Sequence, residues 1–143
     1  MRGLWTRPLR FGDRTSITIP AGAPAISDPV ELSVAPLSCL AVSLFLPEPT
    51  PLTTMHWDGL QTAYISLPGN FAGDADIKTD SRIKARVLVT GTTVDAMPGA
   101  RAVVAFGDPI TDGNASTPDA NHRWPDYFGA AAGKSQQSRG SGA

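Results

Sequence analysis

The chain has 143 residues, which is enough for one ordinary domain with its own hydrophobic core. Its formal net charge of −1 gives no basic footprint of the kind that binds nucleic acid or an anionic membrane. Charged residues make up only 17%, against 14 glycines and 13 prolines, which disfavours a helical bundle and favours short strands joined by turns. No run approaches the ~18 apolar residues that a membrane span needs.

The N-terminal residues 1–8 carry positive charge but no apolar stretch follows them. A complete secretory signal is therefore not expected in this chain, although a relative could carry one, and the sequence assigns no compartment. The single cysteine, Cys39, cannot form an internal disulfide and opens an apolar run, so we expect it to be a small buried hydrophobe.

Residues 1–97 show the pattern of a jelly-roll-like β-sandwich, with short apolar segments separated by Pro- and Gly-rich turns. The strongest strand pattern is Leu40–Leu46, which is mostly apolar on both faces and is typical of a central strand. Pro47 then ends it, because proline cannot donate to a ladder. Further strands are expected at 16–19, 25–32, 61–66, 83–89 and 92–95.

A different architecture is predicted after a break at Met97-Pro98-Gly99. The apolar run 102–106 resembles a buried parallel strand, and a polar loop follows it. A helix is expected to start at Trp124, with Pro125 in its first turn. Residues 98–132 thus read as the first strand and helix of an α/β domain that is not completed, and residues 133–143 as a disordered, linker-like tail.

Residues 107–113, Gly-Asp-Pro-Ile-Thr-Asp-Gly, lie at the end of this predicted strand. They resemble the first signature block of the SGNH (GDSL) hydrolases, which ordinarily reads Gly-Asp-Ser-Ile-Thr-Asp-Gly. The loop 116–126 and the β-rich region upstream are also similar to members of this family. The resemblance implies a three-layer α/β/α serine esterase or lipase that needs no cofactor and cleaves small carboxylic esters or acetylated glycans.

Carried over position by position, the family's nucleophile falls on Pro109. Proline has no hydroxyl, and it also lacks the backbone N–H that would serve as one oxyanion donor. It further drives Asp108 away from helical backbone angles, which we expect to disturb the corner between strand and helix. The remaining block residues match the family and are expected to shape the loop: Gly107, Asp108, Thr111, Asp112 and Gly113. The family's later blocks are absent, so we expect an inactive, truncated member.

Other candidate catalytic or binding residues have weaker support. Asp119 and His122 have the Asp-x-x-His spacing of the family's base and its orienter, but they lie in the first loop, and Ser116 beside them would be a substitute nucleophile only if His122 served it. His56 is expected to be a surface or packing residue.

No metal site is expected from the sequence. Asp74 and Asp76 could suggest calcium, but apart from Asp80 no further carboxylate follows at loop spacing, so a solvated loop is favoured. Asn114-Ala115-Ser116 forms a glycosylation sequon, which matters only in a eukaryotic secretory route.

Two alternatives remain beside the inactive hydrolase. One is a carbohydrate-binding or interaction module built on the β-sandwich, for which exposed aromatic side chains would be needed: Trp57, Tyr64 and Trp124. The other is a gene-fragment product with no function of its own.

Overall fold

The computed structural model describes residues 6–96 and 98–140. It contains two strands and two helices over this range: β1 (Ala63–Ser66), β2 (Thr79–Ile83), α1 (Pro109–Asp112) and α2 (Trp124–Gly140). Contacts divide the chain into two compact units, one formed by Met1–Phe45 with Gly69–Ile77 and the other by Leu46–Pro68 with Lys78–Ala143. Met97, at the break predicted between regions 1–97 and 98–132, lies outside the described residues.

The first unit is held together by local polar contacts. The Asp28 carboxylate accepts a hydrogen bond from the Gly12 backbone N–H at 2.7 Å, and the Asp28 N–H donates to the Arg10 carbonyl at 2.7 Å. Phe11 and Arg14 form an isolated antiparallel bridge around this contact. The strands expected at 16–19 and 25–32 do not form in the described structure.

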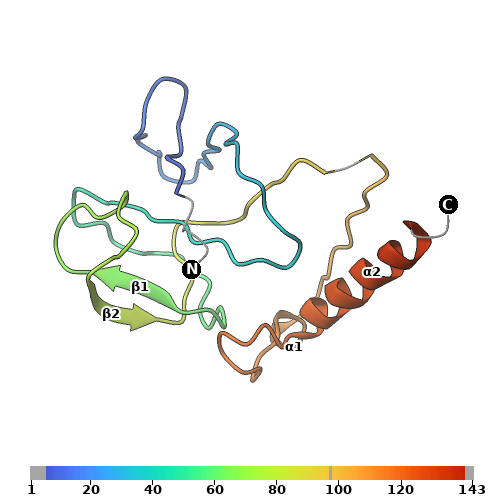
Figure 1. The fold of residues 1–143 in the computed structure, drawn as a ribbon. Coiled ribbons are helices and arrows are strands. Elements are labelled where there is room, and N and C mark those ends of the chain that lie inside the picture. Colours follow the sequence, from blue (N-terminus) through green and yellow to red (C-terminus); the bar gives the residue numbers. More distant parts are fainter. Residues whose placement is uncertain (1–5, 97, 141–143) are drawn as a thin grey trace. The chain divides into compact units, whose positions relative to one another are not determined.

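In the second unit, β1 and β2 form a two-stranded antiparallel sheet (Figure 1). The prediction of a strand at 61–66 is confirmed by β1, whereas β2 begins in a segment, 67–80, that was expected to be a loop. Of the strand expected at 83–89 only Ile83 belongs to β2, and residues 92–95 form no strand. Tyr64 stands opposite Arg82, and the Arg82 guanidinium carbon lies 5.4 Å from the centre of the Tyr64 ring, a cation–π contact. A register shift between Ile65 and Ser66 ends the regular pairing.

The prediction of a β-sandwich followed by an α/β/α domain is wrong. Leu40–Leu46, expected to be a central strand, belongs to no strand, and its large apolar side chains are 44–51% exposed. The run 102–106 also forms no strand, and Phe106 is 98% exposed. An apolar pattern becomes a buried strand only where neighbouring strands supply a ladder and a layer covers each face, and the described residues supply neither. Cys39, expected to be buried, is likewise exposed.

The buried apolar residues among those described are Leu60 and Ala85. They lie near β1 and β2, where the chain segments 56–60 and 84–86 run side by side. Three backbone hydrogen bonds join these segments, two between His56 and Arg86 at 3.0 Å and one from the Gly59 N–H to the Lys84 carbonyl at 2.6 Å. We call this pairing the scaffold; its His56 side chain contacts Asp112 at the end of α1.

The helix predicted to start at Trp124 is confirmed, with Pro125 in its first turn. Proline is tolerated there because the N–H of this position has no partner within the helix. The helix extends to Gly140, beyond the point where the sequence predicts a disordered tail, and residues 141–143 of that tail lie outside the described part. None of the helices over the described residues is long and apolar enough to cross a membrane.

Candidate active-site corner and its pocket

Residues 107–113 form a tight corner built around the short helix α1. Asp108 is its N-cap, with extended backbone angles of φ −98° and ψ −173°. The Asp108 side chain accepts hydrogen bonds from the backbone N–H groups of Ile110 at 3.0 Å and Thr111 at 3.2 Å. By such contacts an N-cap aspartate side chain accepts hydrogen bonds from N–H groups that have no partner within the helix.

Pro109 is the first residue of α1, and the corner accommodates it without distortion. Proline disfavours helical angles at the preceding residue, but an N-cap residue is extended in any case, so Asp108 already has the conformation that Pro109 requires. The expected disturbance of the corner by Pro109 is therefore absent. Proline has neither a hydroxyl nor a backbone N–H, but it fits the shape of this corner.

Gly113 ends α1 in the left-handed conformation, with φ +99°. Its N–H donates to the Ile110 carbonyl at 3.1 Å, and the Asn114 N–H donates to the Pro109 carbonyl at 2.8 Å. The same glycine is buried, and a Cβ atom placed on it would collide with the side chain of Arg123. The glycine thus satisfies two needs at once, a positive φ and a close approach.

A partly open pocket of about 410 Å³ lies beside this corner. Four of the block residues predicted from the sequence line it: Gly107, Asp108, Thr111 and Asp112. Pro109 and Gly113 shape the corner but are not among the residues that line the pocket. The opposite wall comes from the start of α2 and the residue before it, with Arg123, Pro125 and Asp126.

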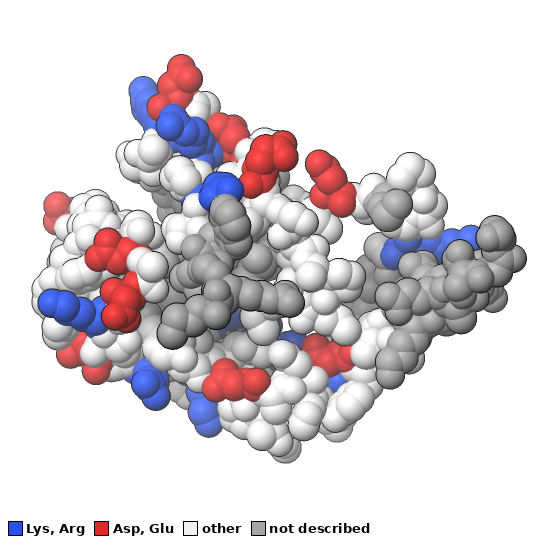
Figure 2. Space-filling view, in the orientation of Figure 1, with Lys and Arg blue, Asp and Glu red and all other residues white. Residues whose placement is uncertain are grey.

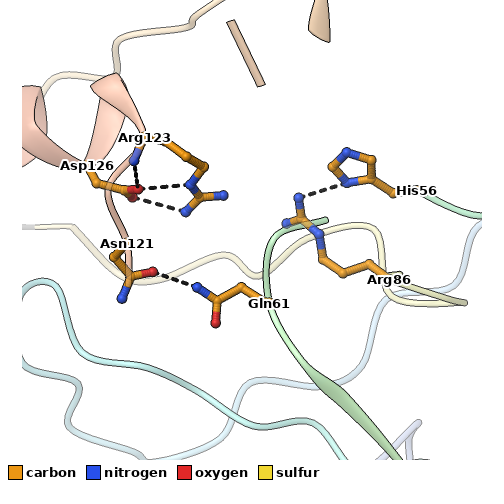
Figure 3. A network of polar contacts seen from close by, with 6 residues as sticks. All are labelled: His56, Gln61, Arg86, Asn121, Arg123 and Asp126. Atoms are coloured by element: carbon orange, nitrogen blue, oxygen red, sulfur yellow. Dashed lines mark hydrogen bonds and ion pairs between the residues drawn. The ribbon is translucent and has the colours of Figure 1, made fainter. Parts of the chain in front are cut away.

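Arg123 and Asp126 form a two-point ion pair in this wall (Figure 3). The Asp126 carboxylate accepts from Arg123 Nε at 2.8 Å and from Arg123 Nη2 at 3.0 Å. It also accepts from the Arg123 backbone N–H at 3.0 Å, so the third residue of α2 caps the helix start. The Arg123 side-chain hydrogen bond is the main cause that lowers the pKa of Asp126, and the same bond raises the pKa of Arg123.

We expect Asp126→Asn to destabilise the second unit by about 1 kcal/mol at neutral pH, because it weakens both the cap and the ion pair. The folded pKa of Asp126 is lowered, so its contribution is complete above the ordinary aspartate pKa of 3.8 and is lost as the pH falls through the folded value. Urea unfolding at neutral pH and at pH about 3 checks this expectation. A difference between the two proteins that stays constant over this range would contradict it.

The loop that follows the block is bound to β1 and the residues before it. Asp119 accepts from the Thr62 backbone N–H at 2.7 Å and from the Thr62 hydroxyl at 2.6 Å, while the Asp119 N–H donates to the Leu60 carbonyl at 2.9 Å. The Gln61 amide donates to the Asn121 side chain at 2.6 Å (Figure 3). The Thr62 hydroxyl is the main cause that lowers the pKa of Asp119.

His56 also contacts the corner: its Nε2 lies 2.5 Å from Asp112 Oδ2. On the other side of the ring, Nδ1 lies 2.8 Å from Arg86 Nη2 (Figure 3). His56 was expected to be a surface or packing residue, and instead it links the block to the scaffold. Nothing in the local sequence could indicate this contact, because the two residues are 56 positions apart.

The catalytic group that Ser116, Asp119 and His122 could have formed, which the sequence disfavours, is not assembled over the described residues. Both oxygens of Asp119 accept hydrogen bonds from Thr62, and the His122 ring stacks on Tyr127 with 5.7 Å between centroids. No hydrogen bond joins His122 to Asp119 or to Ser116 in the described part of the chain. The Asp119-x-x-His122 spacing therefore does not form a base with its orienter.

Acidic and basic side chains are interspersed over the face drawn in Figure 2. Trp57 is 77% exposed, while one face of Tyr64 is occupied by Arg82. Among the described residues, no group of three or more His, Cys, Asp or Glu side chains is arranged to hold a metal ion, Asp74 and Asp76 included.

No family model matches this sequence, and neither a curated protein nor a solved structure shows significant similarity to it.

Proposed function

We propose that the chain is an SGNH-type relative of the serine ester hydrolases that has lost hydrolysis. The proposal rests on the block at residues 107–113 and on one observation, the position of Pro109 as the first residue of α1. The ligand class that the resemblance implies, a small carboxylic ester or an acetylated glycan, would be held beside this corner without being cleaved.

The chemistry supports the loss of activity. A serine esterase needs a hydroxyl nucleophile that an adjacent base deprotonates, and donors that stabilise the oxyanion. Pro109 supplies neither the hydroxyl nor the backbone N–H. Loss of one oxyanion donor alone typically reduces the rate ~100- to 1000-fold, and loss of the nucleophile reduces it much further.

The histidines support the same conclusion. The chain contains two. His56 is contacted at both ring nitrogens, by Asp112 and by Arg86, and His122 stacks on Tyr127. Neither ring is hydrogen-bonded to a hydroxyl group in the described structure, so a base for a nucleophile near the corner is missing as well.

The first test is hydrolysis of p-nitrophenyl acetate by the purified chain. We expect the purified chain to release p-nitrophenolate no faster than an equal mass of a non-enzymatic control protein in the same buffer. Turnover that an active-serine reagent abolishes would show that the chain is an esterase and would overturn the proposal.

The second test is Pro109→Ser, which introduces both the hydroxyl and the N–H at the first position of α1. We expect no gain in hydrolysis, because no histidine is placed to serve the new hydroxyl. Pro109→Ala is the matched control, since it restores the N–H alone. A serine variant that hydrolyses the ester while the alanine variant does not would show that a base is present after all.

A further inference from the structure

The imidazole of His56 is held between two charged side chains that come from different segments. Its Nε2 lies 2.5 Å from Asp112 Oδ2 at the end of α1, and its Nδ1 lies 2.8 Å from Arg86 Nη2 in the segment after β2. The ring and the two charged groups are all partly open to solvent, so protons can reach the ring.

The two contacts define the protonation state of the ring. A guanidinium can only donate hydrogen bonds, so Nδ1 must accept and must carry a lone pair. The proton of the neutral ring is then on Nε2, which donates to the Asp112 carboxylate. The arrangement is that of a neutral imidazole in a single tautomer.

His56 and Arg86 are joined by their backbones as well as by their side chains. The N–H of each of these two residues donates to the carbonyl of the other at 3.0 Å, which forms an antiparallel bridge. The side-chain contact therefore lies directly over the pairing that holds segments 56–60 and 84–86 together. A change at the ring acts on the scaffold below the Gly107–Gly113 corner.

We propose that His56 is a pH-operated latch, in which uptake of a proton at Nδ1 expels the Arg86 guanidinium and loosens the His56–Arg86 bridge. The protonated ring keeps its partner Asp112, because Nε2–H still donates to the carboxylate and the contact becomes an ion pair. At Nδ1, however, a new N–H faces a cation that has no acceptor to offer. At low pH the Asp112–His56–Arg86 chain of contacts is thus replaced by an ion pair between Asp112 and the protonated His56 ring alone.

The charged groups around the ring set the sign of this effect. Asp112 faces it from α1 and Arg86 from the segment after β2. Arg123, before α2, interacts electrostatically with Asp112. The latch concerns the scaffold and not the hydrolytic chemistry, so it stands or falls independently of the proposed function.

The test is amide hydrogen exchange of the full chain at pH about 8 and about 5, which bracket the unperturbed histidine range. After correction for the intrinsic pH dependence of exchange, we expect protection of the His56 and Arg86 amides to fall about tenfold at the lower pH. In parallel, long-range ¹H–¹⁵N spectra of the histidine rings should show His56 protonated only at Nε2 at the higher pH.

Two variants make the result decisive. His56→Gln cannot take up a proton, and Arg86→Met has no charge to expel, so we expect equal protection of the bridge at both pH values in each. Both variants retain His122, so the comparison isolates the contribution of the His56 ring. A neutral His56 ring protonated at Nδ1, or an equal loss of protection in wild type and His56→Gln, would overturn the latch.

Discussion

Gly113→Val is expected to lower the free energy of unfolding of the second unit by about 2–3 kcal/mol. Gly113 has a φ of +99°, where a β-branched residue is strained. In addition, the new side chain would occupy the space that Arg123 fills, so the arginine would have to move and its two-point pair with Asp126 would be disturbed. Urea unfolding followed by tryptophan fluorescence gives the measurement, because Trp124 lies next to Arg123 in the chain.

Gly91→Val is the matched control for this change. Gly91 lies in the same unit, and a Cβ atom placed on it would meet nothing within 4 Å. We expect its unfolding free energy to stay within about 0.5 kcal/mol of wild type. Equal losses for the two variants would show that the corner does not depend on the conformation of Gly113.

Asp119→Ala is expected to release the loop after the block from its support. The substitution removes both acceptors of the Thr62 hydrogen bonds, at 2.7 and 2.6 Å, and leaves the Thr62 N–H without a charged partner. Hydrogen bonds to a charged group are among the stronger ones, so exchange of the Thr62 amide should become at least about tenfold faster. Amide exchange measured by NMR reports this change directly.

Thr62→Ser provides the comparison for Asp119→Ala. Serine keeps a hydroxyl and the backbone N–H, so both bonds to Asp119 can form, and the Thr62 position should retain its protection. If exchange at residue 62 is as fast in the serine variant as in Asp119→Ala, the aspartate does not hold the loop.

The sequence predicts local features of this protein better than long-range ones. The alternation at 61–66 and the Trp124-Pro125 helix start are readable because each depends on a few neighbouring residues. The turn chemistry of the Gly107–Gly113 block is local too, and four of its residues do line one pocket. An Arg-x-x-Asp spacing at 123–126 was a further readable signal, since residues three apart on a helix meet.

The sheet arrangement could not be read in this way. Leu40–Leu46 and the run 102–106 have the apolar character of buried strands, but periodicity reports what a segment could bury and not whether a partner strand is present. β2 was missed for the opposite reason, because Thr79–Ile83 is polar and its pairing with β1 supplies the order. The His56–Asp112 and Thr62–Asp119 contacts join residues 56 and 57 positions apart, and no local pattern encodes them.

The shape of the corner does not depend on the hydroxyl group and the N–H that Pro109 lacks. Asp108 and Gly113 cap α1 at its two ends, and Pro109 fits the first helical position that the cap creates. Proline at position 109 leaves the corner intact because that position needs neither an N–H nor a flexible φ. The intact shape of the corner is therefore no argument for hydrolytic activity.

The most direct test of the proposed loss of hydrolysis is covalent labelling by a fluorophosphonate, a reagent that reacts with activated serine hydroxyls, read by intact mass. We predict no stoichiometric adduct on the wild-type chain, with an active serine esterase labelled in parallel to show that the reagent works. A single adduct that maps to any serine or threonine of the wild-type chain would contradict the account, because it would reveal an activated nucleophile that replaces the missing hydroxyl at position 109.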